Sequence, residues 1–232
     1  MKLFIEGEKI QGIFVKRHNR FVAEVEIEGQ HYFAHVPNTG RMRELLLPGA
    51  KVILRRSKDP MRKTGYDLLF VYKGDLLIAI DSGLPNRLLR EAFEKGQLAY
   101  FQEFTQVKRE VTYGKSRFDF SLNNDHSHGL VEAKCVTLVK EGGLASFPDA
   151  PTVRGTKHVL ELIEAKKQGI RGAVIFIVQR KDAVAFTPNS LMDPAFGEAV
   201  QRAREQGIEF YAYNCQVTPN YVSIDQELGI II

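Results

Sequence analysis

Short runs of alternating apolar and polar residues dominate the first 80 positions of the chain. In FVAEVEI, residues 21–27, an apolar side chain recurs at every second position, as in a half-buried strand. Similar runs, separated by glycine or proline, follow at residues 31–36, 50–57 and 67–81. Many short strands with regular turns predict a small barrel or sandwich. The length fits a five-stranded oligonucleotide-binding (OB) barrel, although an SH3-like barrel would give the same pattern.

The pattern changes after DSGLPN, residues 81–86, where Gly and Pro end a strand and Asn86 is a candidate helix cap. Apolar spacing then predicts a helix, followed by three strands at about 106–113, 116–122 and 130–138. A helix at about 155–168, an apolar strand, a helix opening at Asp193-Pro194 and a last strand complete the chain. We therefore expect an all-β barrel over residues 1–82 and a mixed α/β domain over residues 86–232.

Composition indicates the class of protein and the cellular compartment in which we expect it. The hydrophobic content of 44% is typical of a chain that buries a core, and no apolar run is long enough to span a bilayer. The N-terminus lacks a secretory signal, and two isolated cysteines are too few for a disulfide framework. These features predict a cytoplasmic protein that does not enter a membrane. They do not indicate its oligomeric state.

Positive charge concentrates in the front of the chain. Residues 1–65 hold 13 Lys and Arg against 7 Asp and Glu, a net +6, whereas residues 66–232 hold 19 against 21, a net −2. Basic clusters flanked by an aromatic residue can bind phosphates and stack on bases. The alternative is ordinary solvated turns. The candidate nucleic-acid-binding residues are Lys16, Arg17, Arg20, Phe21, Asn38, Arg41, Arg62 and Lys63.

The main candidate catalytic residues lie in SRFDFSLNNDHSHGLVEAKCVTL, residues 116–138. This stretch predicts two strands joined by a polar turn. Glu132 and Lys134 share one face of their strand, and Asp119 can lie beside them if the strands pair. Two carboxylates next to an ammonium suit a hard divalent cation, Mg²⁺ or Mn²⁺, which keeps several waters. The alternative is a cross-strand ion pair of Lys134 with Asp119 or Glu132.

Further polar residues near this stretch are candidates for a supporting role. They are Glu110 and Arg117 on the predicted strands, Asp149 in a loop that can close over the site, and Lys157, His158 and Glu161 on the next helix. Each also has an ordinary structural explanation as a cap, a helix ion pair or part of a solvated face.

Several segments together resemble the sugar fermentation stimulation protein A family. They are KRHNRFVAEV, HVPNTGRM, the Pro60-to-Lys63 segment PMRK, EVTYGKSRFDF, VEAKCVTL, FPDAPTVRGTKHVLEL and the helix after MDPAF. The resemblance implies an N-terminal OB-type barrel joined to a domain resembling PD-(D/E)xK nucleases. It also implies DNA binding without strong sequence preference. Carried over by position, Asp119, Glu132 and Lys134 would form the nuclease-like site, with Glu110 as a further candidate catalytic residue.

Two functions remain open. The first is a DNA-binding, Mg²⁺- or Mn²⁺-dependent nuclease that uses Asp119, Glu132 and Lys134. The second is a non-catalytic DNA-binding regulator of sugar-metabolism genes that retains a nuclease-like scaffold. A small-molecule enzyme of sugar metabolism has little support, because the chain has no GxGxxG or P-loop lysine motif.

Overall fold

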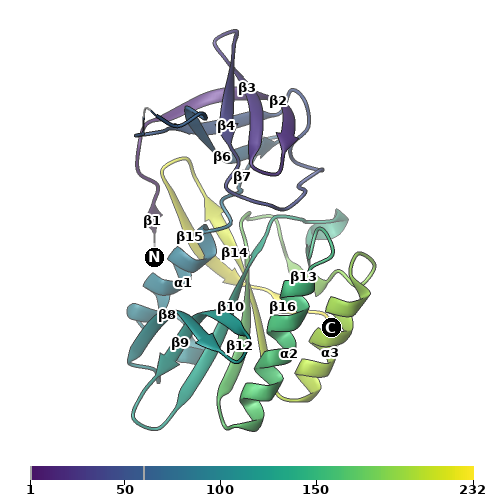
Figure 1. Cartoon of the computed structure of the whole chain (residues 1–232). Coiled ribbons are helices and arrows are strands. Elements are labelled where there is room, and N and C mark those ends of the chain that lie inside the picture. The colour runs from purple at the N-terminus through teal and green to yellow at the C-terminus, as the bar shows by residue number, and fades with distance from the viewer. Residues whose placement is uncertain (1, 60) are drawn as a thin grey trace.

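The N-terminal strands form a barrel that lies above the rest of the molecule in Figure 1. The computed structural model describes residues 2–59 and 61–232, so Pro60 of the PMRK segment lies outside the described residues. The strands are β2 (Lys9–Asn19), β3 (Val22–Ile27), β4 (Gln30–His35), β5 (Lys51–Arg56), β6 (Tyr66–Lys73) and β7 (Leu76–Ala79). Their order is β4-β3-β2-β5-β6-β7.

The barrel closes because β4 also pairs in parallel with β6, through Ala34–Tyr66 and His35–Asp67. Strands β2 to β6 thus form a closed five-stranded barrel, the architecture of an OB fold. The alternation in the sequence explains its packing: every second side chain points inward, and Phe14, Leu54 and Leu68 are fully buried there. The predicted barrel is confirmed.

The second part of the chain is built on a seven-stranded mixed sheet in the order β1-β15-β14-β12-β10-β9-β8. Its strands are β1 (Leu3–Phe4), β8 (Gln106–Tyr113), β9 (Ser116–Asn123), β10 (His128–Val136), β12 (Arg171–Val178), β14 (Glu209–Val217) and β15 (Tyr221–Glu227). β10, β12 and β14 run parallel, and the other pairs are antiparallel. The predicted mixed α/β domain is confirmed.

The first strand belongs to this larger sheet and not to the barrel. Leu3 and Phe4 pair with Val222 and Tyr221 of β15, so the first residues of the predicted 1–82 unit lie against the second domain. A two-residue strand carries no alternation that could assign it from the sequence. The predicted strands also omitted β15 and a small sheet of β11 (Leu144–Phe147), β13 (Ala185–Pro188) and β16 (Gly229–Ile230).

Helices cover both faces of the large sheet (Figure 1). α1 (Leu84–Glu94) packs on one face, and α2 (Val153–Lys167) and α3 (Pro194–Glu205) pack on the other. Two short 3-10 turns lie at Ala99–Phe101 and Glu141–Gly143. No helix in the described part of the chain is long and apolar enough to cross a membrane.

α2 and α3 each begin directly after a residue whose side chain caps the helix. The Thr152 hydroxyl accepts a hydrogen bond from Gly155 N, and the Asp193 carboxylate accepts one from Phe196 N, with Pro194 in the first turn as predicted. The prediction for Asn86 is wrong. α1 begins at Leu84 after Gly83, so Asn86 lies inside the helix and its side chain is free for another contact.

Candidate active site

Strands β9 and β10 separate at the point where the candidate carboxylates lie. The two strands pair only from Asn123–His128 to Phe120–Val131. Beyond that pair, the Asp119 carboxylate takes the place of a backbone partner, because its Oδ2 accepts a hydrogen bond of 2.8 Å from Ala133 N. β10 stays paired with β12 as far as Val136, so only one side of β10 opens. The separation brings Asp119 beside Glu132 and Lys134, as the sequence predicted.

Glu132 is the most buried carboxylate of the group. It is 4% exposed, and its Oε1 accepts hydrogen bonds from Lys134 Nζ at 2.6 Å and from His158 Nδ1 at 2.5 Å. Of the two ion pairs in the alternative interpretation, Lys134 forms the one with Glu132, which lies within β10 and not across two strands. Glu132 Oε2 is buried and has no hydrogen-bond partner among the described residues. A buried carboxylate oxygen without a partner is costly unless a ligand compensates it.

The two neighbouring carboxylates have pKa values shifted in opposite directions. Burial, and next the negative charge of Glu132, raises the pKa of Asp119 above its ordinary value, although Ala133 and Asn86 donate to it. Burial alone would also raise the pKa of Glu132, but the hydrogen bond from His158 and the charge of Lys134 outweigh it and lower that pKa. Glu132 is thus the member of the pair held firmly in its charged form.

Two residues that the sequence analysis did not assign to the site complete the group. Asn86 Nδ2, from α1, donates to Asp119 Oδ1 at 2.7 Å. Arg154 Nε, from the first turn of α2, donates to His158 Nε2 at 3.4 Å, which places the ring proton of His158 on Nδ1, facing Glu132. A polar residue on the largely buried face of α1 was the available signal for Asn86.

A cavity of about 450 Å³ opens onto these residues. Asp119, Glu132 and Lys134 line its floor, and residues 146–152, together with Arg154, line one wall. Asn38, Thr39 and Gly40, from the loop after β4 of the barrel, line another part. Both domains therefore enclose the candidate site.

The donors fit a hydrated divalent cation. Within residues 2–59 and 61–232, no three His, Cys, Asp or Glu side chains gather as a ready-made metal site. Mg²⁺ usually keeps several waters and takes only one or two carboxylates from the protein. Glu132 Oε2, buried without a partner in the described structure, and the neighbouring Asp119 carboxylate meet that requirement.

Four of the predicted supporting residues lie outside this cavity. Glu110 has a left-handed backbone (φ 53°), and its half-exposed side chain lies 3.8 Å from that of Arg117. Lys157 Nζ donates to Lys115 O, and Glu161 Oε1 accepts from Lys115 N. Lys157 and Glu161 therefore hold the turn between β8 and β9 against α2. Of the predicted supporting residues, His158 and Asp149 reach the site or its wall.

Asp149 joins the two domains. Its Oδ2 accepts a hydrogen bond of 3.1 Å from Met42 N of the barrel loop, and a side chain on Gly40 would meet the same oxygen at 2.9 Å. The absence of a Cβ at Gly40 thus permits this close approach.

Two candidate nucleic-acid-binding residues build the loop itself. The Arg17 guanidinium donates to the carbonyl oxygens of Arg20, Asn38, Gly40 and Arg41 at 2.6–3.1 Å. Burial lowers the pKa of Arg17, and the charge of Asp149 opposes that shift. Asn38 is buried, donates to Ile80 O at 2.8 Å and accepts from Gly40 N at 2.8 Å. Both side chains are engaged in holding the backbone.

The other candidates differ in how free their side chains are. Lys16 lies 3.4 Å from Glu24, and the Arg20 guanidinium lies 5.1 Å from the ring centre of Phe21, which is 46% exposed. Arg41 and Lys63 are exposed. These positions remain predictions for nucleic-acid binding.

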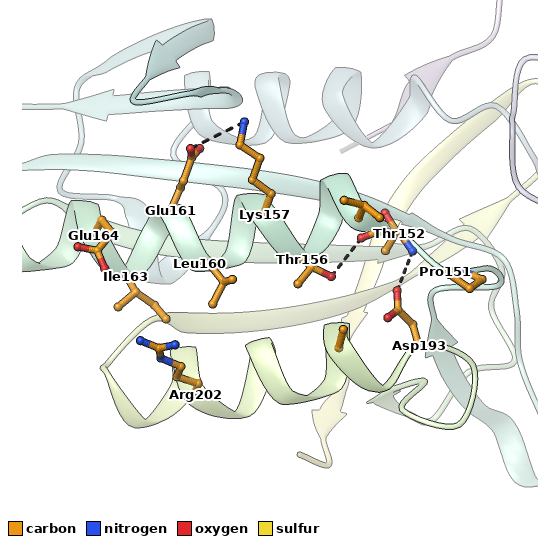
Figure 2. A pocket seen from close by; sticks show the side chains of 12 residues that line it. Pro151, Thr152, Thr156, Lys157, Leu160, Glu161, Ile163, Glu164, Asp193 and Arg202 are labelled. Carbon is orange, nitrogen blue, oxygen red and sulfur yellow. Dashed lines mark hydrogen bonds and ion pairs between the residues drawn. The ribbon is translucent and has the colours of Figure 1, made fainter.

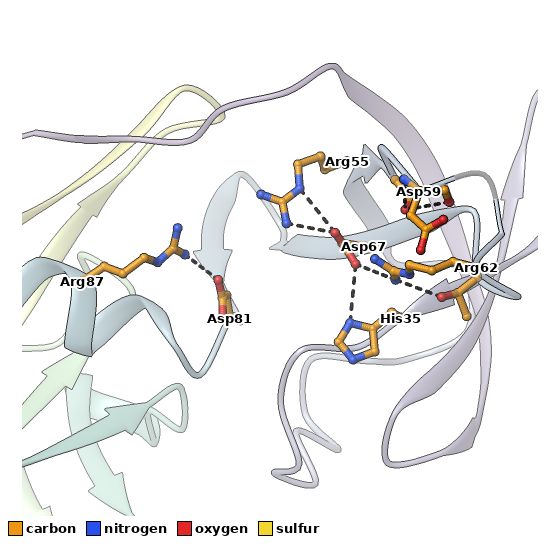
Figure 3. A network of polar contacts seen from close by, with 9 residues as sticks. His35, Arg55, Asp59, Arg62, Asp67, Asp81 and Arg87 are labelled. Atoms are coloured by element: carbon orange, nitrogen blue, oxygen red, sulfur yellow. Dashed lines mark hydrogen bonds and ion pairs between the residues drawn. The ribbon is translucent and has the colours of Figure 1, made fainter. Parts of the chain in front are cut away.

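Arg62 belongs to a polar network on the barrel (Figure 3). Its Nη2 donates to Asp67 Oδ1 and to Thr64 Oγ1, each at 2.9 Å, and Arg55 Nη2 reaches Asp67 Oδ2 at 2.9 Å. Burial would raise the pKa of Asp67, but hydrogen bonds from both arginines outweigh it and lower that pKa. The contacts with Asp67 give Arg62 a structural role.

A larger cavity, of about 580 Å³, lies between α2 and α3 (Figure 2). Leu160 and Ile163 project into it, and Lys157, Glu164 and Arg202 lie at its edge. Its lining is mainly apolar, and it contains neither Asp119 nor Glu132. The smaller cavity, which Asp119 and Glu132 line, is therefore the candidate active site.

Two family models match the chain. The model described as the SfsA N-terminal OB domain matches residues 15–80, and the model described as the sugar fermentation stimulation protein RE domain matches residues 83–221. The first agrees with the barrel topology, and the second contains every residue on the floor of the cavity.

Proteins similar to this chain match over nearly their full length. A sugar fermentation stimulation protein homolog from Alkaliphilus metalliredigens is 62% identical over 231 residues, 99% of this chain and 100% of that protein. A homolog from Clostridium tetani is 46% identical over 220 residues, 94% and 95% of the two chains. The structure of SfsA from Pyrococcus furiosus in complex with Ca²⁺ has a TM-score of 0.91, with 31% identity and 100% coverage of both chains.

Proposed function

Because the chain belongs to the sugar fermentation stimulation protein A family, we propose that it binds DNA without strong sequence preference and hydrolyses phosphodiester bonds with Mg²⁺ or Mn²⁺. The observation that carries the proposal is Glu132 Oε2, which is buried beside Asp119 without a hydrogen-bond partner in the described residues. We place the protein in the cytoplasm, consistent with its two free cysteines.

DNA binding is supported by the barrel and its charge. OB folds bind oligonucleotides through one face and its loops. Residues 1–65 carry a net charge of +6, which favours contact with a polyanion. The exposed Arg20, Phe21 and Arg41 lie on loops of the barrel, where they can contact phosphates or a base. The proposed domain boundary at residues 82–86 is consistent with the two matched ranges.

The divalent cation is supported by the donors and by a relative. Asp119 and Glu132 would hold it, and a bound Mg²⁺ or Mn²⁺ would stabilise negative charge on the phosphate and favour activation of water. The SfsA structure from Pyrococcus furiosus contains Ca²⁺. Divalent cations of this type share a preference for oxygen ligands, so that structure supports a hard-cation site in this chain.

The protein side chains position the reacting groups. His158 and Lys134 fix one oxygen of Glu132 and leave the other without a hydrogen-bond partner among the described residues. Asn86 and Ala133 N fix both oxygens of Asp119. Lys134 Nζ places a positive charge at the cavity floor, where it would stabilise charge developing on the phosphate or orient a water.

The order of elements around the site supports a nuclease-like domain. α1 is followed by the antiparallel strands β8, β9 and β10, then by α2, and then by β12, which is parallel to β10. The candidate acids lie on β9 and β10, at the centre of this unit. The resemblance noted in the sequence placed the PD-(D/E)xK-type residues on these same two strands.

Metal-dependent cleavage of DNA is the direct test. Purified protein is incubated with labelled single-stranded and duplex DNA and with Mg²⁺, Mn²⁺ or EDTA, and the products are resolved on denaturing gels. We expect cleavage with metal, and loss of about 100-fold or more of the rate in Asp119→Ala and in Glu132→Gln. The matched control Glu205→Gln changes an exposed carboxylate on α3 and should retain full activity.

Two results would contradict the proposal. Cleavage that persists unchanged in Asp119→Ala and Glu132→Gln would indicate a contaminating nuclease. DNA binding without any metal-dependent cleavage would instead support the alternative, a non-catalytic DNA-binding regulator of sugar-metabolism genes.

A further inference from the structure

The candidate active site lies at the bottom of a narrow, two-sided cavity. Glu132 and His158 are 4% and 3% exposed, so the reacting groups lie well below the protein surface. The barrel loop at residues 38–40 and the loop at residues 146–152 form facing parts of the wall. The hydrogen bond from Met42 N to Asp149 Oδ2 ties these two loops together. A phosphate must enter the cavity that these loops line to reach the carboxylates.

A second cavity, of about 370 Å³, adjoins the first. Thr39 and Gly40 line both cavities, so this short stretch of backbone is their common rim. The second cavity is lined by Arg17, Arg20, Arg41 and Arg43, and no carboxylate of the described residues lines it. One side of the rim is therefore acidic at its floor, and the other side is strongly basic.

The arginines of the second cavity have two different roles. Arg17 uses both Nη atoms to hold the backbone of the loops, at 2.6–3.1 Å from four carbonyl oxygens. Arg20, Arg41 and Arg43 are exposed, and within the described residues none of them is paired with a carboxylate. Arg17 thus builds the rigid frame, and the other three present free guanidinium groups, the preferred protein partners of phosphate.

We propose that the two cavities are adjacent subsites for one strand of DNA, and that the substrate is single-stranded DNA or a single-stranded end. This inference rests on the proposed function. The strand crosses the rim at Thr39–Gly40, with one phosphate among Arg20, Arg41 and Arg43 and a neighbouring phosphate near Asp119 and Glu132. Phe21, 46% exposed beside Arg20, offers a face on which an unpaired base stacks.

The exclusion of intact duplex follows from the walls. In a duplex, the complementary strand accompanies each phosphate and occupies the space beside it. Here that space is filled by the barrel loop and by the loop carrying Asp149, which contact each other. A strand without its complement can place its backbone in the two cavities on either side of Thr39–Gly40, as in other channels that bind single strands through a basic groove and aromatic side chains.

Binding measured in EDTA tests this inference without requiring hydrolysis. Fluorescence anisotropy is recorded with a labelled single strand of about a dozen nucleotides and with the same strand annealed to its complement. The proteins are the wild type, the Arg41→Gln/Arg43→Gln double variant and the Arg202→Gln/Arg204→Gln control, which removes the same charge from α3. Circular dichroism and thermal unfolding verify that each protein is folded.

We expect the wild type to bind the single strand about tenfold more tightly than the duplex. The Arg41→Gln/Arg43→Gln variant should lose about tenfold in affinity for the single strand, with a salt dependence of log K reduced by about 1.4 for two lost phosphate contacts. The control variant should bind as the wild type does. Equal or tighter binding of the duplex, or unchanged binding by the Arg41→Gln/Arg43→Gln variant, would overturn the inference.

The two proposals fail separately. Without metal, the binding result is independent of whether the protein cleaves DNA. If the protein prefers single strands through Arg41 and Arg43 but never cleaves them, the proposed subsite is supported and the proposed nuclease activity is contradicted. If the protein cleaves through Asp119 and Glu132 but prefers duplex, the proposed nuclease activity is supported and the proposed single-strand subsite is contradicted.

Discussion

At Glu132, the cost of burying a carboxylate is offset by two donors on one oxygen. Lys134 and His158 both donate to Oε1, and Oε2 is buried without a hydrogen-bond partner among the residues described. Such asymmetry is unusual for a purely structural ion pair, in which both oxygens would be satisfied. The arrangement is what a residue requires if it must stay charged and still present an oxygen to a ligand.

Replacing His158 with phenylalanine should weaken this arrangement and keep the ring that packs against Phe118. Since the folded-state pKa of Glu132 is lowered, its ionisation stabilises the protein above the unfolded value of 4.5, and this contribution is lost as the pH falls through the folded value. Without the donor, the Glu132 pKa rises. We expect the free energy of unfolding at neutral pH to fall by about 1–3 kcal/mol.

Urea unfolding over a series of pH values measures this change. The matched control His126→Phe alters an exposed histidine in the turn between β9 and β10. The acid side of the stability profile should move to higher pH in His158→Phe and stay in place in the control. A profile identical to that of the wild type would show that His158 does not support the charge of Glu132.

Single residues also mark how far the sequence alone could predict the site. Asp119, Glu132 and Lys134 stand out because each interrupts an apolar strand, and charged groups there require partners. Asn86 and Arg154 carried no comparable pattern, because a polar residue near a helix start has ordinary capping explanations. Only the tertiary structure brings Asn86 to Asp119, which lies 33 positions further along the chain.

At the level of elements, the separation of β9 from β10 creates the site. Strand periodicity predicted both strands, but it does not show how far along their length they pair. The Asp119 side chain ends the pairing by binding Ala133 N, an event that no alternation pattern encodes. The same limit explains the missed β1 and β16: two residues are too few to show a period.

The helix starts at the cavity wall depend on one another through Asp193. Its Oδ1 accepts from Phe196 N at 3.1 Å and caps α3, and its Oδ2 accepts from Thr152 N at 2.7 Å, next to the start of α2 (Figure 2). Asp193→Ala should therefore lower the free energy of unfolding by about 2 kcal/mol, the upper end for loss of a cap. Urea unfolding measures this, with Asp125→Ala in an exposed turn as the control. A loss no larger than that of the control would contradict the shared-cap interpretation.

At the level of the whole molecule, the barrel and the α/β domain share one hydrophobic core. Ile53, Leu69 and Phe70 of the barrel pack in the same cluster as Leu84 and Leu88 of α1. This apolar contact fixes the barrel loop over the carboxylates, so the cavity depends on both domains. The sequence predicted two domains from composition and turns, but long-range packing of this kind leaves no local signal in the chain.

The shared core also explains how the arginines of the barrel are held at a fixed position relative to the carboxylates of the α/β domain. The exposed arginines and the carboxylates lie on opposite sides of the rim at Thr39–Gly40, and the contact between Met42 N and Asp149 keeps them in fixed relation. In the proposed function, the barrel holds the DNA backbone and the α/β domain holds the cation and the reacting phosphate.

Anomalous diffraction from crystals containing Mn²⁺ shows whether Asp119 and Glu132 together hold a divalent cation. We expect an anomalous peak about 2.1 Å from Glu132 Oε2, also in contact with Asp119, and its loss in Glu132→Gln crystals. A well-ordered cavity without such a peak, at Mn²⁺ concentrations that label other sites, would show that these two carboxylates do not hold the cation.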